Sequence, residues 1–402
     1  MYSKFIIAFL IGLQTCMAQL PVTIAGEHDS IPDAFIDAST GHKVIKLVDR
    51  PGLNFSFYFH NNPFLSSLDG KDQLMVFYGN TEKGSDLFYV NLRTKEIEQI
   101  THNGGSKRGE IIGKMSRKAF FTSNDSIFSV DIDSPHKLTL IKALPAGTVG
   151  SAESINADET KLAAVMASPK EREILREFPE KKDFFDKIYE AKLLRKLLTI
   201  DIKTGDIKEV YQEHAWLNHV QFSPTDPNNL MYCHEGPWHK VDRIWNVDIN
   251  TGENRLLHKR TMDMEIAGHE FFSWDGKTVW FDLQKPRGET FFLAGKNLET
   301  DELTTYKLDR NEWSIHFNIS PDQTLFAGDG GDDGQVAHAP DGRWLYLFKP
   351  EGDHLVSEKL VNMKNHYYKL EPNVHFSPDG KWIIFRANFK NGSQIYAVEI
   401  NK

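Results

Sequence analysis

One phrase recurs along the chain and limits the folds that are open to it. Near the C-terminus it reads KLEPNVHFSPDGKWIIFRAN, and NHVQFSPTDPNNLMYC, GHEFFSWDGKTVWFD and SIHFNISPDQTLFAG repeat its outline upstream. Each copy places a polar turn before an apolar run rich in β-branched and aromatic residues, which is typical of short antiparallel strands joined by tight turns. A further strand of the unit ends in a Thr-Gly turn, as in LLTIDIKTGDIKEV and IWNVDINTGENRLL.

The spacing of the polar turns predicts the architecture. The turns are Leu68-Asp69-Gly70, Met115-Ser116-Arg117, Asn156-Ala157-Asp158, Ser223-Pro224-Thr225, Ser273-Trp274-Asp275, Ser320-Pro321-Asp322 and Ser377-Pro378-Asp379. They number seven and fall about 40 to 70 residues apart, and four strands per unit at such a period indicate propeller blades. We therefore predict an all-β fold, a seven-bladed β-propeller that forms one domain over residues 19–402, with HKVIKLVD (42–49) as the candidate closing strand.

Two segments depart from the repeat. Residues 168–197 are charged and poor in β-branched residues, so they predict a helical insertion in one blade. This insertion is either a solvated surface helix or a side wall over one mouth of the channel. The loop GDGGDDGQVAHAPDG (328–342) is either a plain turn or a hard-cation site built from Asp329, Asp332 and Asp333.

The N-terminus predicts export. MYSKFIIAFLIGLQTCMAQLP has an early lysine, an apolar stretch and then small residues, the pattern of a secretory signal peptide over residues 1–18 that is cleaved after Ala18. The LQTC run loosely resembles a lipoprotein box, so we expect a periplasmic location with an outer-membrane lipoprotein as the alternative. Cleavage leaves Cys233 as the only cysteine, which excludes an internal disulfide. No mature segment is apolar enough to span a membrane.

The net charge restricts the partners. A formal charge of −9 argues against nucleic acid, because phosphate binding needs a basic surface. An acidic oligosaccharide remains compatible, since a few arginines and a metal in one cleft can override the net sign.

A histidine returns to the same register of the repeat. Four residues before the turn serine of successive blades stand His219, His269, His316 and Asn373. The first strand of a blade lines the channel and alternate residues of a strand share a face, so we expect these side chains to converge at one mouth, with Glu371 and His375 flanking Asn373. Imidazole, carboxylate and amide ligands suit a borderline or hard divalent ion such as manganese, and without cysteine ligands a structural zinc site is not expected.

A second cluster lies in YCHEGPWHKVDRIW (232–245), where the repeat calls for a short turn. Its ionisable residues are His234, Glu235, His239, Lys240, Asp242 and Arg243. Two tryptophans, Trp238 and Trp245, bracket this run, and aromatic rings of this kind pack against pyranose rings. The segment is either a sugar-binding lip or a hydrophilic hairpin with buried tryptophan anchors.

At these residues the chain resembles the oligogalacturonate lyase family of pectin-degrading polysaccharide lyases, which are seven-bladed propellers. The resemblance covers essentially the whole mature chain. Its most specific part is CHEGPWHKVDRIW, close to the family's CHEGPHDLVDARMW, and GHEFFSWDG is similar to a THEFW segment. The resemblance implies a manganese ion that binds the uronate carboxylate. It also implies Arg243 as the base, His269 as the histidine of the HEFW segment and His316 as the first metal ligand.

The chain departs from the family where the other metal ligands sit. The family has a Gln-x-x-His-x-His run, whereas YKLEPNVHF offers Glu371 and Asn373 in place of the two histidines. The implied metal set is therefore His316 with these two oxygen ligands, and His375 and His366 are the candidates to compensate. The exchange leaves the metal and the exact uronate linkage open.

The predicted reaction is β-elimination on short uronate oligosaccharides. The C5 proton of a uronic acid is removed and the 4-O-linked sugar is expelled, which leaves a 4,5-unsaturated ring. The family resemblance favours Arg243 as the base, whereas a histidine pKa of about 6.5 makes His269 the easier base on chemical grounds, so both belong to the predicted catalytic set. His219, His234 and His239 are predicted to bind substrate.

Two other functions are compatible with the same propeller. One is a non-catalytic, TolB-like periplasmic binding module, and the crowding of ionisable residues at one mouth argues against it. The other is a lyase that acts on a different uronate linkage.

Overall fold

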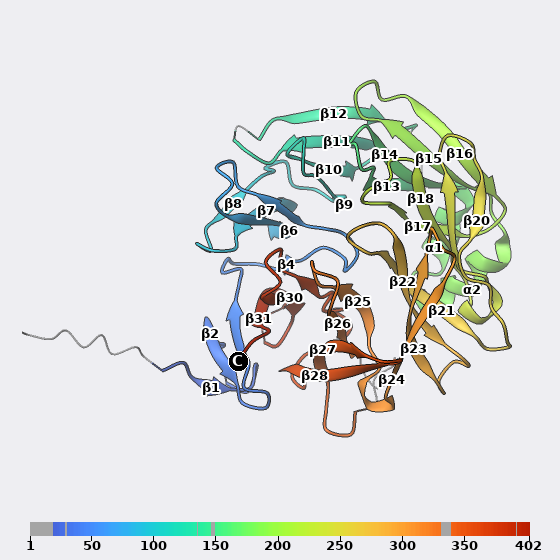
Figure 1. The fold of residues 1–402 in the computed structure, drawn as a ribbon. Helices are drawn as coiled ribbons and strands as arrows, with labels where there is room; N and C mark the ends of the chain where they lie inside the picture. The colour runs from blue at the N-terminus through green and yellow to red at the C-terminus, as the bar shows by residue number, and fades with distance from the viewer. Residues whose placement is uncertain (1–18, 29, 135, 146–148, 331–338, 391) are drawn as a thin grey trace, which may run out of the picture.

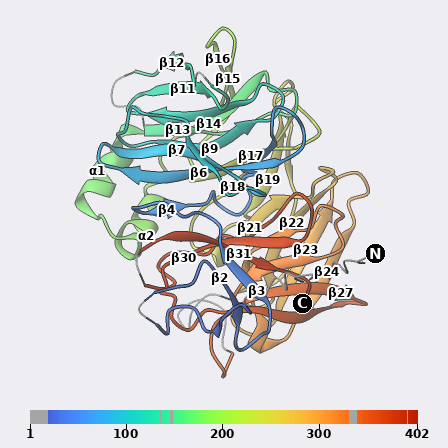
Figure 2. The same ribbon diagram turned by 90° about the vertical axis from the view of Figure 1, so that its left-hand side faces the viewer.

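Short antiparallel strands follow one another around a central channel in chain order (Figure 1). The computed structural model describes residues 19–402 apart from 29, 135, 146–148, 331–338 and 391, so the predicted signal peptide lies outside the described residues. Seen from the side in Figure 2, the N-terminal strands β2 and β3 lie beside β31 near the C-terminus. The predicted all-β, seven-bladed propeller is confirmed.

The first four blades each contain the strands of one repeat. Blade 1 has β4 (Asn54–Phe55), β5 (Phe64–Ser66), β6 (Gln73–Thr81), β7 (Gly84–Asn91) and β8 (Ile97–Gln99). Blade 2 has β9 (Arg108–Gly113), β10 (Lys118–Ser123), β11 (Ser126–Asp131) and β12 (Leu138–Ala143). Blade 3 has β13 (Val149–Ile155), β14 (Lys161–Ala167), β15 (Arg195–Asp201) and β16 (Ile207–Glu213). Blade 4 has β17 (Leu217–Phe222), β18 (Asn229–His234), β19 (Ile244–Asp248) and β20 (Asn254–Leu256).

The last three blades include the ring closure. Blade 5 has β21 (Ile266–Phe272), β22 (Thr278–Gln284), β23 (Phe291–Asn297) and β24 (Leu303–Leu308). Blade 6 has β25 (Ile315–Ile319), β26 (Phe326–Asp329), β27 (Trp344–Glu351) and β28 (His354–Asn362). Blade 7 has β29 (His375–Phe376), β30 (Trp382–Ala387) and β31 (Gln394–Glu399), completed by β1 (Val22–Thr23), β2 (Ala34–Asp37) and β3 (Lys43–Lys46).

The ring closes through the N-terminal strand predicted for this role. β3 pairs antiparallel with β31, with Val44 opposite Val398 and Ile45 opposite Ala397. Val44 and Val398 are both fully buried. The two ends of the chain thus share one sheet, which removes the open edges that an unclosed ring would expose.

Apolar side chains fill the spaces between neighbouring blades. Val76 of β6 packs in one cluster with Phe121 of β10, and Val165 of β14 packs in another with Leu230 of β18. Because these clusters lie between blades, the channel itself is left for the polar residues that begin each inner strand.

Two helices interrupt blade 3, as predicted. They are α1 (Pro169–Glu177), which Ser168 caps, and α2 (Lys181–Ala191). Tyr189 of α2 packs so tightly against the loop after β18 that a Cβ on Gly236 would come within 2.4 Å of its ring. The insertion therefore forms a wall beside that loop. Among the described residues, no helix is long and apolar enough to cross a membrane.

Candidate active site

The residues at the repeated register share one unusual backbone conformation. His219, His269, His316 and Asn373 have φ angles of 49°, 51°, 50° and 50°. Residues other than glycine rarely adopt this left-handed conformation. In β17, β21 and β25 it coincides with a break in the pairing to the next strand, which is a β-bulge. A bulge re-aims its side chain, and the same strain at equivalent positions is typical of a functional site.

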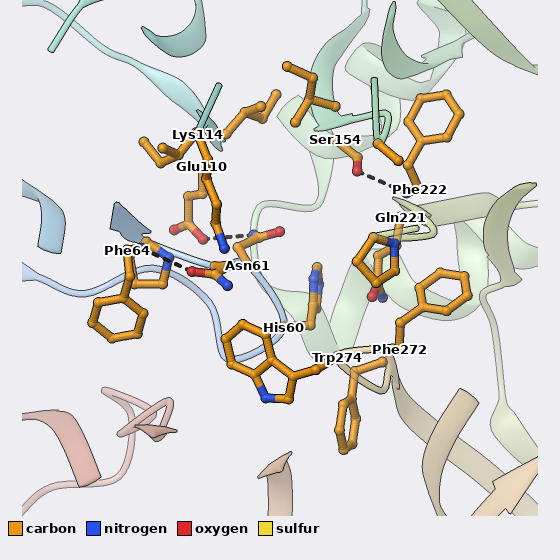
Figure 3. A pocket seen from close by; sticks show the side chains of 18 of the residues that line it. His60, Asn61, Phe64, Glu110, Lys114, Ser154, Gln221, Phe222, Phe272 and Trp274 are labelled. Carbon is orange, nitrogen blue, oxygen red and sulfur yellow. Dashed lines mark hydrogen bonds between the residues drawn. The ribbon is translucent and has the colours of Figure 1, made fainter. Parts of the chain in front are cut away.

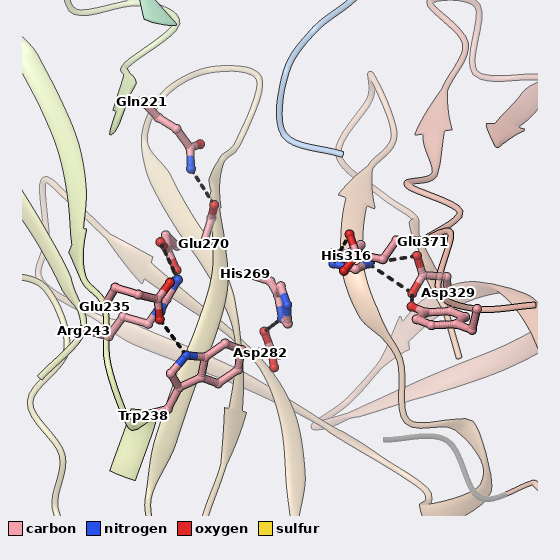
Figure 4. A network of polar contacts seen from close by, with 11 residues as sticks. Gln221, Glu235, Trp238, Arg243, His269, Glu270, Asp282, His316, Asp329 and Glu371 are labelled. Atoms are coloured by element: carbon pink, nitrogen blue, oxygen red, sulfur yellow. Dashed lines mark hydrogen bonds and ion pairs between the residues drawn. The ribbon is translucent and has the colours of Figure 1, made fainter. Parts of the chain in front are cut away.

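A buried aspartate stands behind two of the histidines (Figure 4). His269 Nδ1 lies 2.8 Å from Asp282 Oδ1, and His316 Nδ1 lies 3.0 Å from Asp329 Oδ2. An aspartate that accepts the Nδ1 proton fixes the tautomer and leaves the lone pair on Nε2. The centroids of the two imidazoles are 4.7 Å apart, so they are direct neighbours in the channel.

The segment from Tyr58 to His60, here called the channel plug, crosses the channel against these histidines. The Tyr58 ring stacks on His219 with centroids 6.3 Å apart and meets the His316 ring edge-on at 5.5 Å. The Phe59 ring lies 5.3 Å from the His316 ring. The plug therefore forms the floor of the mouth at which the histidines gather.

Polar side chains from three inner strands or their ends hold the backbone of the plug. Glu110 Oε2 accepts from the Tyr58 N–H at 2.5 Å, and Asn373 Oδ1 accepts from the Phe59 N–H at 3.1 Å. The Asn318 amide donates to the Phe59 carbonyl at 3.0 Å. These bonds satisfy buried backbone groups that no sheet could pair, and they fix the plug in place.

Arg243 lies between two buried carboxylates at the edge of the same mouth (Figure 4). Its Nη1 is 2.8 Å from Glu235 Oε1 and its Nε is 3.0 Å from Glu270 Oε2. The Trp238 indole donates to Glu235 at 2.9 Å, and its ring lies 4.9 Å from the guanidinium carbon. His219 Nε2 is 3.5 Å from the other oxygen of Glu235. We call Arg243, Glu235 and Glu270 the arginine clamp.

The clamp holds its charges in place. Burial alone would lower the pKa of Arg243, but the neighbouring acidic groups hold it well above its ordinary value. Burial alone would raise the pKa values of Glu235 and Glu270, but Arg243 lowers both, that of Glu235 well below its usual range. The two carboxylates thus hold the Arg243 guanidinium in its protonated form.

Because the arginine clamp contains two buried carboxylates, we expect the protein to lose stability in acid. Because the folded-state pKa values of Glu235 and Glu270 lie below the ordinary 4.5, their contribution is present above that pH and is lost as the pH falls through the folded-state values. We expect the urea-unfolding free energy to decline between about pH 5 and about pH 3, and to decline less steeply in Glu235→Gln. The exposed Glu209→Gln should retain the wild-type slope; an unchanged slope in Glu235→Gln would contradict the assignment.

The chemistry of the donors at His316 fits a divalent metal ion. Its Nε2 is buried and has no hydrogen-bond partner among the described residues, and Glu371 Oε2 lies 3.7 Å away. Asp329 holds the other ring nitrogen, so Nε2 is the free ligand atom. An imidazole nitrogen and a partly exposed carboxylate at this separation can share an ion such as manganese.

The other predicted metal residues lie differently. Asn373 is beside the site, but its Oδ1 accepts a hydrogen bond from the channel plug. His375 lies beyond the plug, with Nε2 3.1 Å from the Asn61 carbonyl, and His366 is buried against Tyr368 and Phe389. The described contacts thus give neither histidine the compensating role considered for it. His375 does face the channel, as expected, but further along it.

The predicted substrate residues divide into two groups. His219 belongs to the mouth through its contacts with the plug and the clamp. His234 stacks on Trp245 with centroids 5.2 Å apart and has Nε2 3.3 Å from Glu213 of blade 3. His239 lies in the short helix η1 (Trp238–Lys240). No described contact joins His234 or His239 to the histidines of the channel.

Sequence reasoning missed the aspartates and the plug. Asp282 and Asp329 each stand thirteen residues after their histidine, and each pairs across the strands with the residue that precedes it. This shared spacing between histidine and aspartate could have identified both aspartates from the sequence. Cys233 takes the corresponding position in blade 4, where it is buried and free. Asp329, considered as a loop ligand, supports His316 instead; Asp332 and Asp333 lie outside the described residues.

The site lies at one mouth of a propeller. It combines two oriented imidazoles, the guanidinium of the arginine clamp and a carboxylate that can share a metal ion with His316. These features define an enzyme site for an anionic substrate. The sequence model of the oligogalacturonate lyase family matches residues 29–402, and the chain belongs to this family. It is 23% identical to an oligogalacturonide lyase of Pectobacterium atrosepticum and 24% identical to an oligogalacturonate lyase of Dickeya dadantii, each alignment covering 90% of this chain and 95% of the relative.

Solved structures share the fold. An oligogalacturonate lyase in complex with manganese superposes with a TM-score of 0.78 at 22% identity, covering 92% of this chain and 97% of that chain. The oligogalacturonate lyase of Vibrio parahaemolyticus gives a TM-score of 0.78 at 23% identity, covering 92% and 96%. The low identity is that of a divergent branch of the family.

Proposed function

We propose that this enzyme cleaves short oligogalacturonates by β-elimination and releases 4,5-unsaturated products. The observation that carries the proposal is the pair of Asp-supported imidazoles beside the arginine clamp. Family membership and relatives named for this activity support the same substrate class. The assay is the rise in ultraviolet absorbance when purified protein meets digalacturonate and manganese. A panel of other uronate linkages separates this activity from that of a lyase with another linkage preference.

His269 is the proposed base. Asp282 accepts its Nδ1 proton, so Nε2 carries the lone pair that removes the C5 proton. Trp238 meets the His269 ring edge-on at 5.2 Å, and a Cβ on Gly268 would lie 2.7 Å from that indole, so the glycine permits this packing. The imidazole is thus oriented from two sides.

The clamp gives Arg243 a binding role in this mechanism. Two carboxylates surround one guanidinium, so the clamp has a net negative charge and cannot by itself attract a uronate. Three of the five N–H groups of Arg243 are used, which leaves two to donate to a substrate oxygen. A divalent ion held by His316 and Glu371, which we propose to be manganese, would supply the Lewis acid that stabilises charge developing on the substrate carboxylate.

Loss of the His316 imidazole should remove the ion. We expect His316→Ala to bind manganese at least about 100-fold more weakly than the wild type, with a parallel loss of turnover. Titration calorimetry and elemental analysis measure the metal directly. The exposed His354→Ala is the control and should bind as the wild type does; undiminished binding by His316→Ala would contradict the ligand assignment.

Tyr58 is the proposed proton donor to the leaving oxygen. Burial raises the pKa of its phenol well above the usual value, and the charges of Glu371 and Glu270 raise it further, so the hydroxyl stays protonated. We expect Tyr58→Phe to lower kcat by about 100-fold while leaving the unfolding free energy nearly unchanged. The control is the exposed Tyr367→Phe. Wild-type kcat in Tyr58→Phe would remove Tyr58 from the mechanism.

We also propose that the protein is exported to the periplasm. The basic, apolar and small-residue sequence of residues 1–18 supports this location. Mass spectrometry of the protein recovered from cells should find an N-terminus at Gln19, whereas an intact Met1 would contradict export by this signal.

A further inference from the structure

The channel has a second mouth on the other side of the channel plug, and a cavity of about 400 Å³ opens there (Figure 3). Pockets for small molecules have volumes of about 300–1,000 Å³. The polar residues that the inference uses are His60, Asn61, Glu110, Lys114, Glu153 and Gln221. The described lining includes neither Arg243, His269, His316 nor Glu371, so the cavity is separate from the catalytic mouth.

The plug divides the two mouths. Tyr58 faces the catalytic histidines, Phe59 contacts His316 and also borders the cavity, and His60 and Asn61 line the cavity. Asn61 is anchored from both sides: its amide donates to Glu110 Oε2 at 2.9 Å and its carbonyl lies 3.1 Å from His375 Nε2. A molecule in the cavity would rest on a fixed floor.

The free polar atoms of the cavity are mainly acceptors. Both described bonds to Glu110 go to Oε2, which leaves Oε1 available. Gln221 uses its Nε2 on the Glu270 carbonyl, which leaves its Oε1. The Nδ1 atom of His60 is buried without a hydrogen-bond partner among the described residues. Groups of this kind are satisfied by a ligand rich in hydroxyl donors.

The titratable groups of the cavity disfavour a charged ligand. Burial raises the pKa values of Glu110 and Glu153 above their ordinary value, and it lowers the pKa of His60 to about 3, so the His60 imidazole carries no charge near neutral pH. A uronate would face two carboxyl groups here without a guanidinium in the described lining. A cation would meet the ammonium of Lys114 at the rim.

Trp274 supplies an aromatic wall. Its indole N–H donates to the Ile319 carbonyl at 2.9 Å, which fixes the plane of the ring, and the side chain is half-buried. The Lys114 ammonium lies 5.5 Å from the ring centroid. Because Lys114 is exposed, it can move from the ring to a hydroxyl of a ligand.

We propose that this cavity binds a neutral pyranose sugar, one or two rings long, at a site separate from the catalytic mouth. The sugar ring packs on Trp274, its hydroxyls donate to Glu110, Glu153 and Gln221, and Lys114 donates to a ring substituent. This combination of one aromatic wall with convergent amide and carboxyl groups suits a carbohydrate, and the described lining includes no guanidinium to bind a carboxylate bidentately.

The test measures equilibrium binding of D-galactose, L-rhamnose, D-glucose and their disaccharides to the full chain. Binding is measured by calorimetry and by tryptophan fluorescence. At least one neutral sugar should bind saturably to the wild type and equally to His269→Ala. Its affinity should fall at least about tenfold in Trp274→Ala and in Glu153→Gln, as expected for loss of a stacked ring or of a hydrogen bond to a buried group. Galacturonate should not compete for the site.

Three outcomes would overturn the proposal. The first is that no neutral sugar binds saturably. The second is that a neutral sugar binds but neither Trp274→Ala nor Glu153→Gln weakens its binding. The third is that only galacturonate binds and that its binding is lost in Arg243→Lys. Glu153→Gln preserves shape, so it keeps the test valid if Trp274→Ala fails to fold. Lyase turnover of Glu153→Gln should match the wild type, which separates failure here from failure of the proposed reaction.

Discussion

Replacement of Arg243 by methionine is expected to lower kcat/KM by about 100- to 1,000-fold and the free energy of unfolding by about 3 to 5 kcal/mol. The substitution leaves Glu235 and Glu270 buried side by side without the guanidinium that both contact. It also removes the N–H groups proposed to bind the substrate. Initial rates on digalacturonate and urea unfolding measure the two effects separately.

The conservative variant and a surface control sharpen this result. Arg243→Lys keeps the charge but not the planar fork, so it should recover part of the stability and little of the activity. Arg255 also pairs with an aspartate, Asp301 at 2.5 Å, but both side chains are well exposed. Arg255→Met should therefore cost less than about 1 kcal/mol and leave the rate unchanged. Wild-type stability and rate in Arg243→Met would contradict the clamp.

Replacement of His269 by alanine is expected to lower kcat by about 100- to 10,000-fold. The imidazole is the group proposed to remove the C5 proton, so its loss leaves the elimination without a base. Asp282→Asn should lower kcat at least about tenfold, because it no longer enforces the tautomer that leaves Nε2 basic. Initial rates at saturating digalacturonate are the measurement.

A second buried His–carboxylate pair provides the matched control. His258 Nε2 lies 2.7 Å from Glu265 Oε1, outside the channel contacts described for His269. His258→Ala should reduce stability and leave kcat unchanged. If His269→Ala retained the wild-type rate, the base would have to be another group, and Arg243 would return as the candidate.

The architecture and the histidine register were predictable because both follow from strand periodicity. A repeat that places a turn at a fixed distance from the inner strand also fixes which residue faces the channel, and this placed His219, His269 and His316 correctly. The same rule predicted that Glu371 and His375 share the channel side. It could not tell that the plug lies between them, because a strand advances about 3.3 Å per residue and the four residues from Glu371 to His375 are enough to pass it.

The parts that sequence reasoning missed depend on contacts between segments with no repeat pattern. The plug around Tyr58 is irregular backbone, held by Glu110 and Asn373 from distant parts of the chain. The left-handed bulges leave no mark in the sequence, since histidine and asparagine are not obliged to adopt them. Glu270 follows His269 directly and would face away from it in a regular strand; it lies within the bulge of β21, and from there its carboxylate contacts Arg243.

The central claim is that the imidazoles gathered round the propeller's channel carry out an elimination. Mass spectrometry of the products formed from digalacturonate tests it most directly. The account predicts one fragment lighter than galacturonate by one water molecule, formed by the wild type and not by His269→Ala. Two results would contradict it. One is the formation of two galacturonates of full mass, which indicates hydrolysis. The other is an equal yield of the lighter fragment from His269→Ala.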